Sequence, residues 1–502
     1  MNIEFKKTIE EKTSCEIHFI SKKEKEFILS ESAKRVDELT EGAITNTVTN
    51  NDYKGDFGSG FFVTTNKLNS NEALIISLGD LKKLILNPNS FSESRDENKC
   101  KDLGGQIYSL LQSRGTKGKV AIYADTMGVN IAFGMMLKTY NFNKYYTGDK
   151  VPKYTNFDLV IQDDNEESAN KLFQDKKAIA QSIFFTKDLI SEPSNILYPQ
   201  SYADRVTAMA VDTGLNIKVF GEKELEDIGM RALLSVGQGS ARESKVVVME
   251  WMNGGDSKPI ALVGKGVCFD TGGYSIKPSR GLKDMKYDMG GSAVVVGTMM
   301  SLAMRKSKVN AVGVIGLVEN MVSSNAYKPG DVIKSLSGQT IEIDNTDAEG
   351  RVVLADCLWY TQDKYKPSAM VNLATLTGAI SIALGDQLGG LFSNNDELSD
   401  QLLKAGKEVN EKLWRLPCDP LGERYDKYVD STIADMHNVG KGGEASSTTA
   451  AQFLQRFVND TPWAHLDIAG VTWNDKGSMT ASGGATGWGV QLLNKWIHNE
   501  KL

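Results

Sequence analysis

The chain has 502 residues, of which 41% are hydrophobic and 24% are charged, and its formal net charge is −7 at pH 7. A chain of this length exceeds one hydrophobic core, so we expect roughly two to four domains at about 150 residues each. The acidic balance argues against a phosphate-binding surface as the main function, so nucleic acid is not an expected partner.

The N-terminal segment and the apolar runs argue against a secreted protein and against a membrane-spanning protein. Residues 1–7 lead into charged sequence with no apolar signal segment, and the longest apolar run, residues 293–304, is too short to span a bilayer. The five cysteines show no Cys-x-x-Cys spacing, which suits free thiols in a reducing compartment. We therefore expect a cytoplasmic protein without a membrane partner.

Residues 1–180 alternate strand-like and helix-like segments, which predicts a small N-terminal α/β domain with helices on the faces of its sheet. The glycine-rich segment 55–60 does not match the spacing of a dinucleotide or Walker loop, so we interpret it as an ordinary loop. The expected elements are strands over residues 16–20, 60–65, 73–78, 119–124 and 157–162, and a helix over residues 129–140.

A helical stretch over residues 166–190 ends at the turn-forming sequence SEPSN, residues 191–195, which marks a boundary. The following alternation predicts a larger C-terminal domain, residues 181–502, with a mixed sheet flanked by helices and ligands at the carboxyl ends of strands. Its expected strands cover residues 217–220, 246–251, 260–263, 311–317, 340–344 and 369–373, and its expected helices cover 222–227, 293–305, 352–360 and 450–458, with another starting at residue 202.

The segment NTDAEGR, residues 345–351, carries two closely spaced carboxylates. It follows the expected strand 340–344 and precedes the apolar segment 352–360. In extended chain, Asp347 and Glu349 point the same way, and the partial positive charge of a helix N-terminus helps to keep them ionised.

A second polar cluster follows the buried strand 260–263. Paired glycines at residues 272–273 turn the chain so that Asp270, Lys277 and Asp288 face a common site. If these residues meet the two carboxylates of NTDAEGR, each like-charged pair costs roughly 4 kcal/mol at about 4 Å and an effective dielectric constant of about 20. Protonation, nearby lysines or bound divalent cations would offset this cost.

These motifs are similar to those of a known enzyme family. NTDAEGR, with GKGVCFDTGG and SIKPS upstream, closely resembles the leucyl aminopeptidase (cytosol aminopeptidase) family of two-metal exopeptidases. The resemblance extends to WAHLDIAG at residues 463–470 and GATGWGV at residues 484–490, so it covers most of residues 190–495. It implies a metal-dependent aminopeptidase that acts on peptides with a free N-terminus, prefers leucine-like first residues with broad specificity, and assembles as a homohexamer.

The resemblance also implies a ligand set. Asp270, Asp347 and Glu349 would hold one ion, while Lys265, Asp270, Asp288 and Glu349 would hold the other. A lysine ligand must be neutral, so cations would have to lower the pKa of Lys265; from sequence alone, Lys265 as a charge-balancing cation is an equally good interpretation.

Two divalent ions per chain are therefore expected. Oxygen-rich ligands favour hard or borderline divalent ions such as manganese, magnesium or zinc, and manganese is the metal we expect. None of the four histidines lies in either cluster, which argues against a histidine-based zinc site.

The same resemblance gives roles to two further side chains. Lys277 would donate to the developing oxyanion, and Arg351 would hold a bicarbonate that relays a proton. Without the resemblance, a pairing of Arg351 with Asp347 or Glu349 is an equally good hypothesis. Met285 and the segment 374–379 are candidates for the pocket that receives the first side chain of the substrate.

Two other functions remain open at this point. Carboxylate clusters also serve two-metal hydrolysis of phosphoesters. A DNA-binding regulatory protein on the same scaffold is the alternative from a different class, although the acidic balance argues against it.

Overall fold

The computed structural model describes residues 1–24, 26–50, 53–80, 96–440 and 442–499. Contacts within the chain define two compact units. Unit 1 contains Met1–Ala180 and Lys476–Gly483, and unit 2 contains Gln181–Asp475 and Gly484–Leu502. Both units combine sheets with helices, so the predicted α/β class is confirmed.

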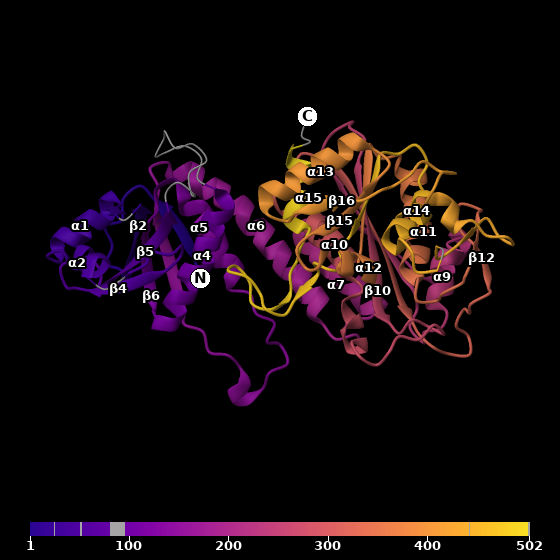
Figure 1. Cartoon of the computed structure of the whole chain (residues 1–502), viewed down its shortest axis with the longest axis horizontal. Helices are drawn as coiled ribbons and strands as arrows, with labels where there is room; N and C mark the ends of the chain where they lie inside the picture. The colour runs from indigo at the N-terminus through magenta and orange to yellow at the C-terminus, as the bar shows by residue number, and fades with distance from the viewer. Residues whose placement is uncertain (25, 51–52, 81–95, 441, 500–502) are drawn as a thin grey trace. The chain divides into compact units, whose positions relative to one another are not determined.

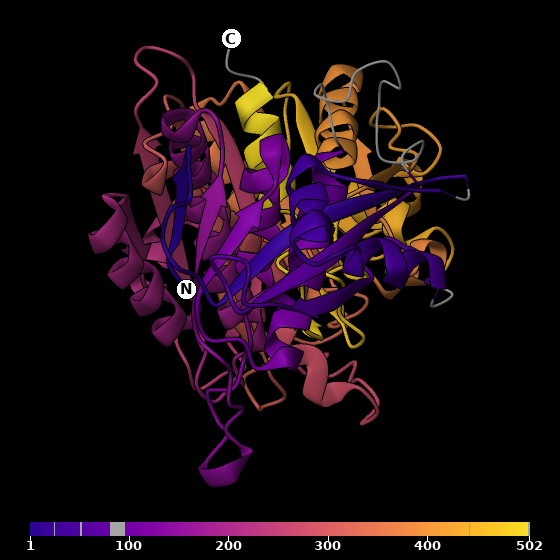
Figure 2. The same ribbon diagram turned by 90° about the vertical axis from the view of Figure 1, so that its left-hand side faces the viewer.

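The sheet of unit 1 has the strand order β1-β7-β6-β2-β5-β4, with β3 paired to β2. The first five strands of this order are parallel, whereas β4 is antiparallel to β5. Figure 2 turns this unit towards the viewer. The strands are β1 (Ile3–Lys6), β2 (Cys15–Lys23), β3 (Glu26–Leu29), β4 (Gly60–Thr64), β5 (Glu72–Asp80), β6 (Gly118–Tyr123) and β7 (Phe157–Gln162).

Helices cover both faces of this sheet, as Figure 1 shows. One face packs against α1 and α2 through a core that includes Ile20, Val36 and Ile75, and the other packs against α4 and α5 through a core that includes Ile17, Leu103 and Ile131. The helices are α1 (Glu31–Leu39), α2 (Ala43–Asn50), α4 (Glu97–Arg114), α5 (Gly128–Lys138) and α6 (Glu166–Ser191), the last of which continues into unit 2.

A segment from late in the sequence completes unit 1. Residues 476–483 form a turn whose carbonyl groups, Ser478 O and Ala481 O, accept hydrogen bonds from Lys138 Nζ at 3.0 and 3.2 Å. The chain therefore leaves unit 1 after residue 180 and returns to it about three hundred residues later before ending in unit 2.

The main sheet of unit 2 has the order β16-β15-β18-β14-β10-β11-β9-β8. Its centre, β18-β14-β10-β11, is parallel, so the carboxyl ends of these four strands share one edge. The strands are β8 (Asn216–Phe220), β9 (Lys245–Met252), β10 (Ile260–Asp270), β11 (Asn310–Asn320), β14 (Ala369–Ala374), β15 (Gly389–Ser393), β16 (Leu413–Arg415) and β18 (Trp463–Asp467); the smaller sheets contain β12 (Val332–Lys334), β13 (Thr340–Glu342) and β17 (Met436–His437), and β19 (Trp473–Asn474) with β20 (Gly484–Ala485).

Figure 1 shows α10 and α15 on one face of this sheet and α9, α11 and α14 on the other. The near-continuous apolar runs of β10, β11 and α10 follow from burial on both sides. The helices are α7 (Pro199–Thr213), α8 (Glu222–Ile228), α9 (Arg231–Gly237), α10 (Gly290–Met304), α11 (Glu349–Tyr365), α12 (Gly378–Leu384), α13 (Asp396–Val409), α14 (Ser446–Gln455) and α15 (Val490–Asn499).

Within the described part of the chain, no helix combines the length and the apolar character that crossing a bilayer requires.

Candidate active site

The carboxyl end of β10 supplies the first two site residues. Lys265 and Asp270 both lie within this strand, which runs seven residues beyond its predicted end at residue 263. Asp270 pairs in register with Asn320 at the end of β11, and its Oδ1 accepts hydrogen bonds from Asn320 Nδ2 and from Gly272 N, each at 2.8 Å. The Asp270 carboxylate is therefore fixed at the shared edge of the parallel strands.

A glycine turn follows Asp270, as the sequence predicted. Gly272 has φ +85°, a left-handed conformation that favours glycine, and a Cβ at this position would lie 2.8 Å from Asp347 Oδ1. The turn lets the chain double back so that Lys277 N donates to Thr271 O, and Lys277 Nζ reaches the carboxylates.

The NTDAEGR segment approaches from the opposite side of this turn. Glu349 is the first residue of α11 and not, as expected, a residue of extended chain before the helix, whereas Asp347 lies in the preceding turn. The turn is fixed by Thr346, whose carbonyl oxygen accepts hydrogen bonds from Asn320 Nδ2 and from the Tyr327 hydroxyl. The helix therefore begins three residues before its predicted start at residue 352.

Four carboxylates and two lysines meet here. Oxygen atoms of Asp270, Asp347 and Glu349 lie within 4.8 Å of one another. Lys265 Nζ lies 2.7 Å from Asp288 Oδ1 and 2.9 Å from Glu349 Oε1. On the other side of the cluster, Lys277 Nζ lies 2.7 Å from Asp270 Oδ2 and also forms an ion pair with Asp347 Oδ1.

The pKa values reflect this crowding. Burial, followed by the charge of Asp270, raises the pKa of Glu349 to about 8. Burial also raises the pKa of Asp288 to about 6, although Lys265 opposes the shift. Burial lowers the pKa of Lys265, but the charges of Asp288 and Glu349 outweigh it, so the pKa of Lys265 is raised overall. The protein's own groups thus keep Lys265 charged, and only added cations could make it a neutral ligand.

Asp288 Oδ2 and Glu349 Oε2 are buried carboxylate oxygens of the cluster that have neither a hydrogen bond nor an ion pair with a described residue. A buried carboxylate oxygen without a donor is costly, and when all four carboxylates are ionised the two lysines leave two negative charges uncompensated. Hard divalent cations bind such oxygen atoms preferentially. These side chains therefore fit a site for divalent ions.

Arg351 lies in the first turn of α11 and is buried. Burial lowers its pKa to about 10, against the charges of Glu349 and Asp467, and its Nε has no hydrogen-bond partner. The ion pairs found among the described residues do not include one between Arg351 and Asp347 or Glu349, so the simple pairing hypothesis is not supported. A buried guanidinium with a free donor suits a small oxyanion.

Supporting residues of the site were missed by sequence reasoning. Thr375 Oγ1 donates to Asp288 Oδ1 at 2.8 Å, and Thr375 O accepts from Lys265 Nζ at 3.1 Å, so this residue of the proposed substrate pocket orients two site residues. Asn320 holds both Asp270 and the Thr346 carbonyl. Asn320 is the last residue of β11 and Thr375 directly follows β14, and a polar residue at the end of a buried strand was the available signal.

A separate polar group lies outside this cluster. Glu342, Asp344 and His437 approach one another, with His437 Nδ1 2.8 Å from Asp344 Oδ2. These residues are partly exposed, so an ordinary surface ion pair accounts for them.

Comparisons with known proteins match this geometry. The model of the cytosol aminopeptidase family, catalytic domain, matches residues 184–494. A protein of Ehrlichia ruminantium (strain Gardel) named "Probable cytosol aminopeptidase" is 53% identical over 414 residues, which are 81% of this chain and 82% of that protein. One of the same name from Wolbachia pipientis wMel is 49% identical over 454 residues, 89% of this chain and 87% of that protein.

The chain belongs to the cytosol aminopeptidase family.

The family resemblance predicted from the motifs is thus confirmed, and the protein is a hydrolase, a metal-dependent aminopeptidase. A solved structure agrees over almost the whole chain. The bottromycin maturation enzyme BotP in complex with Mn superposes with a TM-score of 0.80 at 27% identity, covering 97% of this chain and 99% of that one.

Proposed function

We propose that this member of the cytosol aminopeptidase family releases leucine-like N-terminal residues from peptides, with broad specificity, in the cytoplasm and as a homohexamer. The observation that carries the proposal is the convergence of Asp270, Asp347 and Glu349 within 4.8 Å, beside the unpaired oxygen of Asp288. An apolar pocket discriminates by only roughly 1–3 kcal/mol per methylene group, which supports broad specificity.

Two divalent ions are the proposed cofactors, with manganese as the expected metal and zinc or magnesium as alternatives. Asp270, Asp347 and Glu349 would hold the first ion, and Lys265, Asp270, Asp288 and Glu349 the second. When bound, such a pair acidifies water, polarises a carbonyl group and attracts a free α-amine. The need for a free N-terminus follows from the last of these properties.

Lys277 is the proposed donor to the substrate. Its Nζ is held between Asp270 and Asp347, and its side chain is 20% exposed, so it can reach a substrate carbonyl from this position. A donor that already points at the place where negative charge develops stabilises the transition state more than the ground state. Lys277 would therefore bind the substrate carbonyl oxygen and strengthen this hydrogen bond as the oxygen becomes negative.

Arg351 is the proposed holder of a bicarbonate. Its buried guanidinium has a donor without a partner, and Asp467, which shares its surroundings, is itself fixed by Thr377 Oγ1 at 2.7 Å and Leu376 N at 3.1 Å. Arg351 would hold this anion in place, and the bound anion would supply a base for the transfer of a proton to the leaving amine.

We also propose that residues 1–180 and 181–502 correspond to an N-terminal and a catalytic domain. The contact-defined units support this division except for residues 476–483, which pack with the N-terminal part.

The test removes bound metal by chelation and then restores it. Reconstitution with manganese, zinc or magnesium should restore hydrolysis of leucine anilide, with two ions bound per chain and no hydrolysis of the N-acetylated substrate. Equal cleavage of blocked and free substrates would contradict the proposal. A phosphoester assayed in parallel tests the rival chemistry, and a salt-dependent DNA shift assay tests the DNA-binding alternative, which gains no support from the relatives.

A further inference from the structure

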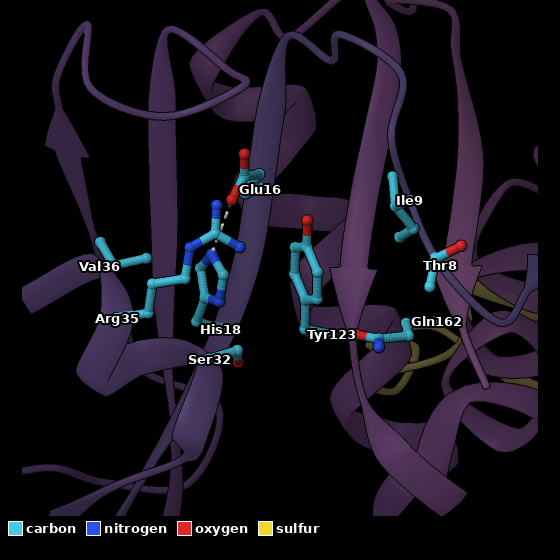
Figure 3. A pocket seen from close by; sticks show the side chains of 9 residues that line it. All are labelled: Thr8, Ile9, Glu16, His18, Ser32, Arg35, Val36, Tyr123 and Gln162. Carbon is cyan, nitrogen blue, oxygen red and sulfur yellow. Dashed lines mark ion pairs between the residues drawn. The ribbon is translucent and has the colours of Figure 1, made fainter. Parts of the chain in front are cut away.

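Unit 1 contains a cavity of about 240 Å³ that the proposed chemistry does not use. It lies on the face of the N-terminal sheet that α1 covers, and Figure 3 shows its lining. Glu16 and His18 come from β2, Tyr123 and Gln162 are the last residues of β6 and β7, and Arg35 comes from α1. The volume is slightly below the roughly 300–1,000 Å³ of pockets for drug-sized ligands, so it suits a small metabolite.

The cavity occupies a position where parallel sheets commonly bind ligands. β2 leads through β3 to α1 on one face, whereas the neighbouring strand β6 leads to α5 on the other face. Chain connections that depart to opposite faces leave a crevice at the carboxyl ends of the strands. The cavity lies there, because β6 and β7 end at its lining residues while β2 continues past it.

Two polar side chains that line the cavity are buried. Glu16 is 3% exposed and His18 is 2% exposed, and they occupy alternate positions of β2 whose other residues, Ile17 and Phe19, enter the opposite core. The His18 ring stacks on Tyr123 with 4.9 Å between ring centroids.

The hydrogen-bonding capacity of His18 is unfilled. Its Nε2 lies 3.3 Å from Glu16 Oε2, but neither ring nitrogen has a hydrogen-bond partner of good geometry. Burial lowers the pKa of His18 although the neighbouring Glu16 opposes the shift, so this ring is a neutral donor and acceptor. Buried polar atoms without partners require an explanation, and a bound polar molecule provides one.

Arg35 supplies the opposite charge at the rim. It is exposed on α1 and extends towards Glu16 and His18 in Figure 3. Among the described residues, no ion pair involves Arg35. Its neighbour Lys34 does form one, with 2.6 Å between Lys34 Nζ and Glu31 Oε1. The cavity thus presents a buried carboxylate and an unpaired guanidinium on either side of a neutral ring.

We propose that this cavity is a binding site for a free α-amino acid. The ammonium group would bind Glu16, the carboxylate would bind Arg35, and His18 would complete the hydrogen bonds to either group. Free amino acids are also the products of aminopeptidase action, so the site would let unit 1 respond to product that accumulates in the cell.

Other ligand classes fit less well. A phosphate or a nucleotide would bring its negative charge against buried Glu16. A metal ion would find only Glu16 and His18, and the groups of three or more candidate metal ligands found in the described part of the chain do not include this pair. A zwitterion matches both charges.

Calorimetric titration of the full-length, metal-loaded enzyme with L-leucine tests the proposal. We expect a leucine site that is weakened at least tenfold in both Glu16→Gln and Arg35→Met. The catalytic site is expected to keep its own affinity for leucine in these variants, and their hydrolysis of leucine anilide without added leucine should remain within twofold of the parent enzyme. Leucinol and N-acetyl-leucine, each of which lacks one charge, should bind the affected site at least tenfold more weakly than leucine.

Lys34→Met is the matched control, because Lys34 is an exposed neighbour of Arg35 on α1 that does not line the cavity. It should leave every leucine site unchanged. Arg35→Met keeps the test decisive if Glu16→Gln impairs folding, since Arg35 is exposed. Identical leucine isotherms for the parent enzyme and Arg35→Met would overturn the proposal, as would equal loss of affinity in Lys34→Met.

Discussion

The side chain of Lys265 passes directly over Gly350, so closely that a Cβ at position 350 would lie 2.5 Å from Lys265 Cε and 2.7 Å from its Nζ. The ammonium group of Lys265 is held by Asp288, Glu349 and the Thr375 carbonyl. The absence of a side chain at Gly350 therefore allows Lys265 to place its ammonium group at the centre of the carboxylate cluster.

Gly350→Ala should displace Lys265 and lower kcat/KM at least tenfold, with reduced metal content. It should not unfold the protein, because alanine is favoured over glycine in a helix by up to about 1 kcal/mol. Elemental analysis, kinetics and thermal unfolding together check this. Gly378→Ala, also at the start of a helix but with open space around its Cβ, should keep the full metal content. Wild-type metal content in Gly350→Ala would show that Lys265 adapts freely.

Asp288 and Glu349 should differ in their effect on metal stoichiometry. Asp288 is the proposed ligand of one ion, whereas Glu349 is proposed to contact both. Asp288→Asn should therefore retain about one ion per chain after dialysis, and Glu349→Gln should retain fewer. Elemental analysis of both variants decides the matter. Equal metal loss would argue against a bridging role for Glu349.

Lys277→Met should lower kcat by roughly 10²–10³-fold, the effect of removing one donor to a developing oxyanion, while KM changes little. Its metal content should stay near that of the parent enzyme, because Lys277 is not a proposed ligand. Lys277→Arg should recover part of the activity, since it restores a charged donor. Loss of metal in parallel with activity would mean that Lys277 mainly balances the charges of Asp270 and Asp347.

His465 should make the stability of unit 2 depend on pH. Burial lowers its pKa to about 3, and Asn372 Nδ2 lies 2.9 Å from its Nδ1, so the folded protein holds this ring neutral. The unfolded chain takes up a proton below pH of about 6.5, the folded protein does not, and stability therefore falls as pH falls below that value. From pH 6.5 to 5 the loss should be about 2 kcal/mol in the free energy of unfolding.

Urea unfolding followed by tryptophan fluorescence measures this loss, because all seven tryptophans lie in unit 2. His465→Asn, which cannot titrate, should have a shallower pH dependence. The exposed His498 near the end of α15 gives the control variant His498→Asn, which should retain the parent slope. An unchanged slope in His465→Asn would assign the pH dependence to other groups.

The sequence predicted the chemistry better than the local structure around it. The carboxylates of NTDAEGR and the glycine turn after Asp270 could be interpreted because charge and turn formers are local signals. The end of β10 could not be predicted, since Gly264 and Gly266 interrupt its apolar run, and Lys265 was therefore placed outside the strand.

Other features depend on partners that are distant in sequence. The contact of Thr375 with Asp288 spans 87 residues, and that of Asn320 with Asp270 spans 50. In the N-terminal sheet, residues 16–20 were predicted correctly as a strand, but alternation alone could not tell that Glu16 and His18 face a cavity. Such placements follow from tertiary packing, for which a single sequence carries no direct signal.

The return of residues 476–483 to unit 1 has a consequence for biosynthesis. At roughly 5–20 residues per second, a ribosome needs about 15–60 s to translate the stretch between residues 180 and 476. Throughout that interval the carbonyl partners of Lys138 do not yet exist, so the first part of the enzyme to emerge is among the last to be finished. A nascent chain arrested before residue 476 would expose the α5 surface that this turn covers. Chaperones or proteases could bind this exposed surface and so recognise incomplete chains.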